Sequence, residues 1–392
     1  MEPKITLLML YDELSNALES TVTHIEPIKT FKRPGSLVTF CRVQISRSLD
    51  TYVWIKTQGR KPILDLNFKA PVKFSGDAAH KHVKQHSSDQ QTLRKELGVY
   101  EKRTIRDYDL TKHLYNTLDL SGPFLVPRPL FHSPEHYLMV TEHMAGEPLQ
   151  DKIARGARWM SSMSQQKSLE KECYQVGQWL RAFQEATRDY CPGMSHGLEL
   201  LKVKNSERIV EQTMDRVEQL TQQDSSVFDQ RLICLIKNFL VQNLTEAQQS
   251  KNSKNDYICS VHGDFFPGNI LSNKNSVIGL DFTGSTWGSR YHDLSYFVFQ
   301  IETLCKNIRY KNSVRHPMIT AFVSGYGNIN LDDLDKGFWN LNPEIKNNFV
   351  SHCISRLLFL YDSSWNSLNP RFVYRKIDFY RTKKQLAQHI SK

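Results

Sequence analysis

The sequence lacks an apolar run long enough to cross a bilayer. The longest run near its start, from Ile5 to Leu10, is far shorter than the roughly 20 residues that a membrane-spanning helix needs. This short run and the acidic Glu2 are also untypical of a secretory signal. We therefore expect a cytoplasmic protein.

The sequence also lacks paired cysteines. Its seven cysteines are odd in number and lie far apart, and no two have the spacing of a metal-binding or redox motif. We therefore expect free thiols in a reducing compartment. The seven are Cys41, Cys173, Cys191, Cys234, Cys259, Cys305 and Cys353.

Acidic residues are fewer than basic ones, 41 against 51, so the net charge is +10. This excess favours an anionic partner such as a nucleotide, a phosphorylated glycan or an acidic membrane surface, although a solvated basic face would give the same count. Nucleic-acid binding needs a concentrated basic stripe or a known module. The charge here is scattered, so we predict no nucleic-acid partner.

The length of 392 residues and 40% hydrophobic content predict two lobes. Residues 36–57 alternate in the manner of a strand hairpin, and the polar stretch 76–91 is typical of a surface loop. Leu93, Leu97, Tyr100 and Ile105 have helical spacing, with Glu96 beside their stripe.

Proline and glycine cluster around an apolar strand at residues 125–149, which predicts the lobe boundary. We expect an N-terminal lobe over 1–140 and a C-terminal lobe over 141–392, with a hinge at about 141–146. Helical patterns dominate after the boundary, and the polar tract 245–256 is expected to form a loop.

The stretch VHGDFFPGNILSNKNSVIGLDF, residues 261–282, concentrates polar groups among apolar ones. Short β-branched runs precede His262 and Asp281, so each predicts a buried strand that ends at a polar side chain. The Pro-Gly pair between them predicts a turn that brings Asn269 back toward Asp264. An Asp that accepts a hydroxyl proton, and an Asn and Asp that hold a divalent cation, are what phosphoryl transfer from a nucleotide requires.

HGDFFPGNIL followed by IGLDF resembles the catalytic and metal-binding loops of the aminoglycoside phosphotransferase and choline kinase-like family. The resemblance implies an α+β, bilobal protein kinase-like fold with a small antiparallel-sheet N-lobe and a larger helical C-lobe. It implies Asp264 as the catalytic base or acceptor-orienting carboxylate, Asn269 and Asp281 as Mg²⁺ ligands, and His262 and Asp293 as supports of the loop.

The same resemblance extends upstream. Lys56, at the end of YVWIK, matches the lysine that grips the α and β phosphates, and Glu96 in KELGVY matches the helix acid that pairs with it, with Glu101 as the alternative. Main-chain groups near Glu142 and Met144 would bond the adenine of ATP, with GTP as the alternative nucleotide. The sequence departs from the family at its phosphate-covering loop, where only KRPGSL is present, and in the long insertion 58–91.

The acceptor that we expect is a hydroxyl of a sugar or another small metabolite. A polycationic aminoglycoside would need clustered carboxylates. The acidic run at 331–335 is one source of them, but the chain as a whole is basic. Aromatic residues after the metal-binding motif either stack on an acceptor or belong to the core. They are Trp287, Tyr291, Tyr296, Trp339, Tyr361 and Trp365.

The C-terminal stretch 371–385 is basic and aromatic, a composition suited to an anionic membrane surface and to an acceptor carried on a lipid. The favoured alternative is a helix docked through Val373, Ile377 and Tyr380 with its charges solvated. An amino alcohol acceptor and a catalytically silent nucleotide-binding regulator remain alternatives to a sugar kinase. No obligatory protein partner is evident.

Overall fold

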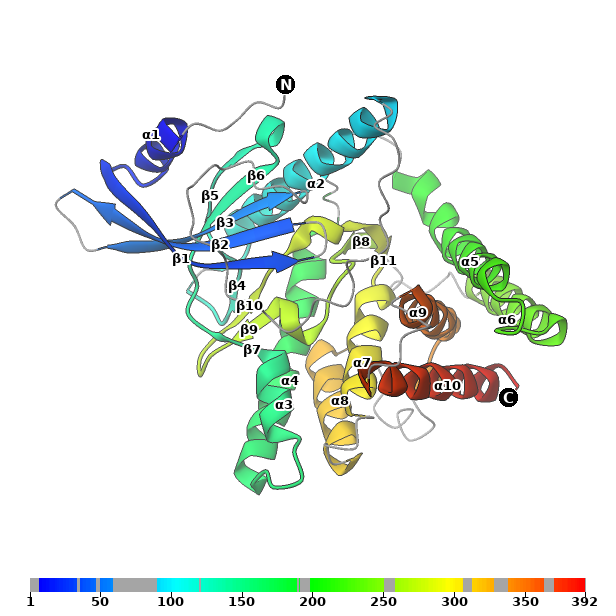
Figure 1. Cartoon of the computed structure of the whole chain (residues 1–392). Helices are drawn as coiled ribbons and strands as arrows, with labels where there is room; N and C mark the ends of the chain where they lie inside the picture. The colour runs from blue at the N-terminus through cyan, green and yellow to red at the C-terminus, as the bar shows by residue number, and fades with distance from the viewer. Residues whose placement is uncertain are drawn as a thin grey trace.

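A computed structural model shows an antiparallel sheet at one end and a larger helical part at the other (Figure 1). It describes residues 7–33, 36–46, 50–58, 90–119, 121–188, 190, 198–249, 258–305, 312–327, 338–362 and 370–391. The insertion at 59–89, Gly35 and the acidic run at 331–335 lie outside the described residues.

The N-terminal sheet has five strands in the order β1-β2-β3-β6-β5, all paired antiparallel. Val53 and Ile55 alternate with outward residues along β3 and pack with Val140 against Leu10 and Leu14 of α1, which forms a separate small core. The elements are α1 (Leu7–Ala17), β1 (Val22–Arg33), β2 (Ser36–Ile45), β3 (Thr51–Gln58), β5 (Pro129–Ser133) and β6 (Leu138–Glu142).

Helix α2 (Gln90–Thr117) connects the two parts of the molecule. It confirms the helix predicted around residues 93–105 and continues three turns further. Leu110 and Leu114, near its C-terminal end, are fully buried and belong to the core of the helical part. The lobe boundary at residue 140 stays a prediction, because this helix contributes to both sides of it.

The helical part contains two small sheets that position the polar loops. In one, β10 pairs with β9 and β4, and in the other β8 pairs with β11. The strands are β4 (Phe124–Leu125), β7 (Glu147–Pro148), β8 (Ile258–Val261), β9 (Ile270–Ser272), β10 (Val277–Gly279) and β11 (Thr286–Ser289). The helices are α3 (Leu149–Gly156), α4 (Met163–Ala186), α5 (Leu198–Gln223), α6 (Gln230–Gln249), α7 (Tyr291–Cys305), α8 (Asn312–Tyr326), α9 (Pro343–Asp362) and α10 (Pro370–Ile390).

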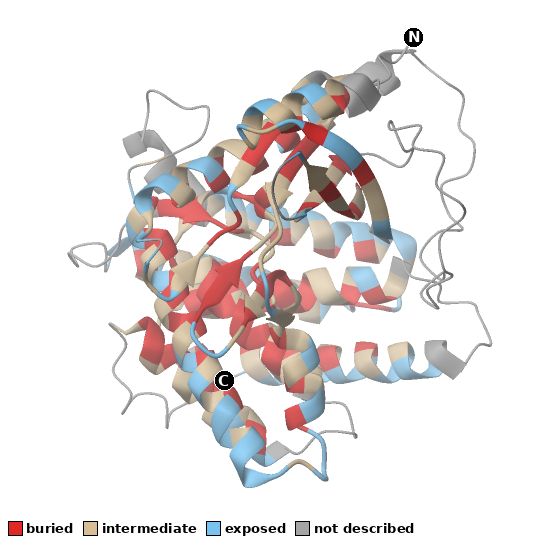
Figure 2. Ribbon diagram, turned by 90° about the vertical axis from the view of Figure 1, so that its left-hand side faces the viewer, coloured by how far each residue is buried: buried red, intermediate tan, exposed pale blue. Residues whose placement is uncertain are grey.

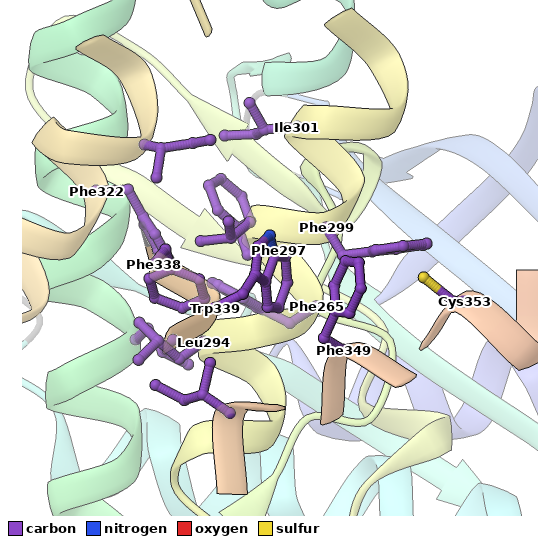
Figure 3. Packing of buried hydrophobic residues seen from close by; sticks show 14 of the residues in the cluster. Phe265, Leu294, Phe297, Phe299, Ile301, Phe322, Phe338, Trp339, Phe349 and Cys353 are labelled. Carbon is purple, nitrogen blue, oxygen red and sulfur yellow. The ribbon is translucent and has the colours of Figure 1, made fainter. Parts of the chain in front are cut away.

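Aromatic side chains form the centre of the larger core (Figure 3). Phe265 packs against Phe297 of α7 with ring centroids 5.4 Å apart, and Phe297 packs against Phe322 of α8 at 4.2 Å. On its other side Phe265 stacks on Trp179 of α4. Figure 2 shows that buried residues line the inner faces of these helices. Because Phe265 follows Asp264 directly, the core fixes the backbone of that carboxylate.

Two predictions about the helical part were wrong in detail. Residues 245–249, expected in a loop, extend α6, because Ala247 is buried against the core. The C-terminal helix does not dock through Val373, Ile377 and Tyr380, which are all exposed. It docks through the opposite face, with the buried side chains of Phe379, Thr382, Leu386 and Ile390.

The described residues also bear on the predictions about the cysteines and about passage across a membrane. Cys41, Cys173, Cys234, Cys259 and Cys353 form no disulfide, as predicted, whereas Cys191 and the side chain of Cys305 are not described. Within the described ranges, every helix is too short or too polar to cross a membrane.

Candidate active site

The loop after β8 is held by Asp293, at the start of α7. The backbone N–H of His262 donates to Asp293 Oδ2 at 2.7 Å, and that of Gly263 donates to Oδ1 at 3.0 Å. The buried imidazole of His262 bonds through Nε2 to the carbonyl oxygen of Leu280 at 3.0 Å, which ties this loop to the one that carries Asp281. The side chains of His262 and Asp293 are both fully buried.

Gly263 is required by its backbone. Its φ of 81° lies in the left-handed region, which residues with a side chain rarely adopt. A Cβ at this position would overlap the carbonyl oxygen of Gly284. The close approach of these two glycines lets the loops of Asp264 and Asp281 lie side by side.

Asp264 is held by two donors. The tight turn at Pro267–Asn269 returns the chain, so that Asn269 Nδ2 donates to Asp264 Oδ2 at 3.2 Å and to its backbone oxygen at 3.0 Å. Tyr296 of α7 donates its hydroxyl to Asp264 Oδ1 at 3.3 Å. Burial raises the pKa of Asp264, and the nearby Asp281 adds to this, whereas the two hydrogen bonds oppose it.

Asp281 lies opposite Lys56 of β3. Lys56 Nζ donates to Asp281 Oδ1 at 2.5 Å, and Thr283 Oγ1 lies 2.7 Å from the same oxygen. Burial alone would raise the pKa of Asp281, but the Lys56 ammonium holds it well below its usual value. Conversely, burial would lower the pKa of Lys56, and its two carboxylate partners raise it to about 12. Both groups are therefore charged at neutral pH.

The α2 carboxylate at the lysine is Asp107. Its Oδ2 accepts from Lys56 Nζ at 2.7 Å and its Oδ1 accepts from the backbone N–H of Phe282 at 2.9 Å. The sequence had suggested Glu96, which lies eleven residues earlier on α2, about 16 Å along the axis. The side chain of Glu96 is not among those described, and the alternative, Glu101, is exposed.

Sequence reasoning missed both Asp107 and Thr283. A signal was present for Asp107, because Thr104, Asp107 and Thr111 continue the buried stripe of α2 toward Leu114 at intervals of three and four residues. An acid inside a stripe that is otherwise shielded from water needs a buried partner. Thr283 gave no comparable signal, because its contact depends on how the chain turns after Asp281.

A cavity of about 330 Å³ lies between the sheet and the helical part. Lys56, Asp107, Asn269 and Asp281 line one side of it. Glu142 and Met144 line it at the predicted hinge. The apolar walls are Phe31, Val38, Met139, Leu271, Leu280 and Phe282. The cavity therefore joins an apolar slot to a polar end with a fixed lysine.

Asn269 and Asp281, whose side chains carry oxygen atoms, line the same cavity. Carboxylate and amide oxygens are hard donors, which suit Mg²⁺, an ion that usually takes only one or two protein carboxylates and completes its shell with phosphate and water. The described residues contain no group of three His, Cys, Asp or Glu side chains placed to bind a metal by themselves. The donor set thus fits a cation that is brought in with a nucleotide.

The other side of Asp264 is bordered by α7 and α9. The Tyr296 ring lies 5.2 Å from that of His352, which bonds Ser295 Oγ at 3.1 Å. Arg356, one turn after His352, pairs with Asp378 of α10 at 2.7 Å. Of the aromatic residues suggested as acceptor contacts, Tyr296 bonds Asp264, Trp339 is buried in the core, and Trp365 lies outside the described residues.

Comparisons with known structures support a kinase-like fold. An amicoumacin kinase in complex with AMP-PNP, Ca²⁺ and Ami is 12% identical with a TM-score of 0.51 over 98% of this chain and 93% of that chain. An aminoglycoside phosphotransferase in ternary complex with ADP and hygromycin B is 9% identical with a TM-score of 0.50 over 97% and 98%. A choline kinase from Cryptosporidium parvum Iowa II is 16% identical with a TM-score of 0.45 over 93% and 91%.

Family membership has a separate basis. No curated protein matches the chain. The model of the phosphotransferase enzyme family matches residues 82–328, more than half of the chain, and this range includes the loops of Asp264 and Asp281. The chain therefore belongs to the phosphotransferase enzyme family and is an enzyme of the kinase-like class that its sequence motif resembles.

Proposed function

We propose that the protein transfers the terminal phosphoryl group of ATP to a hydroxyl of a small molecule. The observation that carries this proposal is the meeting of two neighbouring loops, in which Asn269 bonds Asp264 and Lys56 bonds Asp281, while Asn269, Asp281 and Lys56 line one cavity. Phosphoryl transfer depends mainly on positioning and on charge stabilisation, and these groups supply both.

The nucleotide would lie in the cavity with its base in the apolar slot. Met144 and the carbonyl of Glu142 would bond the adenine edge, because the N–H of Glu142 already donates to Arg128 O at 2.9 Å. Lys56, fixed by Asp107, would contact the phosphates. AMP-PNP in the amicoumacin kinase and ADP in the aminoglycoside phosphotransferase support an adenine nucleotide as the phosphoryl donor.

Asn269 and Asp281 would hold Mg²⁺. When bound, this ion supplies charge neutralisation for the phosphate oxygens. The lowered pKa of Asp281 suits this role, because a carboxylate that binds a metal ion must be deprotonated at neutral pH. Lys56 of the N-terminal sheet and Thr283, two residues after Asp281, orient the same carboxylate.

Asp264 would accept the proton of the acceptor hydroxyl. Burial raises its pKa, which makes it a stronger base than an exposed aspartate. Tyr296 occupies Oδ1 in the absence of an acceptor, and Asn269 holds Oδ2. His262 and Asp293 keep the loop in place without contacting the substrate.

The acceptor class that we favour is a neutral polyhydroxylated metabolite of the sugar type. The region next to Asp264 carries Tyr296, His352 and the Arg356–Asp378 pair, a set with no excess of acid. A polycationic antibiotic would need several unpaired carboxylates. Bilobal organisation with a hinge at about 141–146 is part of the same proposal, because Glu142 and Met144 line the nucleotide cavity there.

The test is phosphate transfer by the purified full chain. MgATP or MgGTP is incubated with a panel of sugars, amino alcohols and aminoglycosides, and ADP or GDP release is followed together with the mass of the acceptor. Asp264→Asn keeps the shape of the side chain but removes the base, so kcat should fall ~10²- to 10⁴-fold, with nucleotide affinity retained. Asp151→Asn, at an exposed carboxylate of α3, is the matched control.

The outcomes separate the alternatives. A variant Asp264→Asn as active as the unchanged chain contradicts the assigned base. Nucleotide binding without transfer to any acceptor in the panel supports a silent regulator instead. Transfer to aminoglycosides but not to sugars would keep the mechanism and overturn the acceptor class.

A further inference from the structure

Helix α10 presents an apolar stripe to solvent. Its buried residues, Phe379, Leu386 and Ile390, face α9 and the core, and Figure 1 shows the helix at the edge of the helical part next to α9. On the other face Val373, Ile377 and Tyr380 are 57%, 41% and 60% exposed. At about 100° per residue these three side chains fall within one stripe about 60° wide.

The same helix carries half of the net charge of the chain. It has six Lys and Arg residues and one Asp, which gives +5 of the total +10. The one acid, Asp378, is paired with Arg356 of α9. The exposed Lys376 and Arg381 flank the apolar stripe on its two sides, and the exposed Lys384 lies in line with the stripe, one turn beyond Tyr380. Tyr374, 63% exposed, lies beside Arg381.

We propose that this face of α10 binds an anionic membrane surface. Helices that lie in a membrane interface combine apolar and aromatic side chains on one face with flanking lysine and arginine, which attract acidic headgroups. A second copy of the chain would bring two +5 faces together and be repelled. Nucleic acid would engage the charges but gives no partner for the aliphatic side chains of Val373 and Ile377.

The location of α10 gives this contact a consequence for the active site. Asp378 of α10 pairs with Arg356 of α9. Arg356 interacts electrostatically with Tyr296, whose hydroxyl group donates to Asp264. A bilayer on α10 would therefore lie near the acceptor side of the catalytic carboxylate. The inference goes beyond the proposed function and does not depend on it, because binding is measured without turnover.

The experiment is co-sedimentation of the full chain with vesicles. Vesicles of phosphatidylcholine alone are compared with vesicles that contain about a third phosphatidylglycerol. Binding should need the anionic lipid and weaken as salt is raised. The triple change Lys376→Gln, Arg381→Gln and Lys384→Gln should weaken it on the order of 100-fold. A matched triple removes the same charge from the α3–α4 region and should bind as the unchanged chain does: Arg158→Gln, Lys167→Gln and Lys171→Gln.

The apolar contribution has its own pair of variants. Ile377→Ser should weaken vesicle binding, whereas Met160→Ser, at an exposed methionine in the α3–α4 loop, should not. Thermal unfolding and nucleotide binding verify that each variant is folded. Equal binding to neutral vesicles, equal loss in the matched triple, or no sedimentation with either vesicle overturns the proposal. Binding of duplex DNA at physiological salt that is unaffected by Ile377→Ser would overturn it in favour of a nucleic-acid surface.

Discussion

Replacing Asp107 with asparagine tests how Lys56 is held. Both carboxylate oxygens of Asp107 accept from buried donors, Oδ1 from the N–H of Phe282 and Oδ2 from Lys56 Nζ. An amide has one acceptor oxygen, so either the backbone N–H or the ammonium must face an NH₂ group. The side chain of Asp107 is 4% exposed, so water has little access to the position of the lost acceptor, although Lys56, 15% exposed, faces the cavity.

The size of the effect follows from these contacts. A buried donor left without an acceptor costs about 1–3 kcal/mol, and hydrogen bonds to charged groups contribute about 1.5–3 kcal/mol. Removing one partner of a buried ion pair costs about 3–5 kcal/mol, but Lys56 retains Asp281 here. We therefore expect Asp107→Asn to lower the free energy of unfolding by about 2–4 kcal/mol and to weaken ATP binding.

The assay is urea unfolding at neutral pH with isothermal titration of ATP. Glu101→Gln changes an exposed acid on the same helix and should alter stability by less than about 0.5 kcal/mol. Glu96→Gln forms the third arm. If Glu96→Gln weakened ATP binding while Asp107→Asn behaved like Glu101→Gln, the assignment of the helix acid would be refuted.

Three further changes test neighbouring contacts. Tyr296→Phe removes a hydrogen bond that lowers the pKa of Asp264, so the acid limb of kcat/KM should move to higher pH; an unmoved limb would mean that Asp264 is not the titrating base. Burial holds the pKa of His352 well below 6.5, so at mildly acidic pH this imidazole binds a proton in the unfolded chain but not in the folded chain. Stability should therefore fall as pH drops from 7.5 to 5.5, the range in which an unfolded histidine gains its proton, and His352→Gln should flatten that decline in urea unfolding; an unchanged slope would contradict it. Gly279→Ala would force a Cβ into the ring of Trp179 and should cost about 1–3 kcal/mol in thermal unfolding, and an unchanged midpoint would refute the close approach.

The polar loops were predictable because their determinants are local. His262, Asp264, Asn269 and Asp281 lie within twenty residues and are separated by short apolar runs and a Pro-Gly turn. Strand ends and tight turns fix where such side chains point, so the sequence indicated their meeting.

The lysine partner and the orientation of α10 were not predictable in the same way. On a helix of 28 residues the apolar period predicts which face is buried, but not which turn of that face reaches Lys56. That turn is set by packing against β5 and the loop at Phe282. On α10, Val373, Ile377 and Tyr380 form one apolar stripe, and Phe379, Leu386 and Ile390 form another. Helical periodicity allows either stripe to pack against the core, and the shape of the core at α9 determines which stripe is buried.

Two carboxylates outside the proposed chemistry explain why the active loops hold their shape. Asp293 accepts from His262 and Gly263, where φ is positive, and Asp107 accepts from Phe282, directly after Asp281, whose φ of 66° is also left-handed. Glycine adopts a left-handed φ without steric penalty, but at Asp281 this conformation costs of order 1–3 kcal/mol and persists only where the surroundings impose it. A carboxylate that accepts backbone N–H groups at these points offsets that cost. The two loops are therefore fixed before any nucleotide binds, so the substrate's binding energy is not needed to order them.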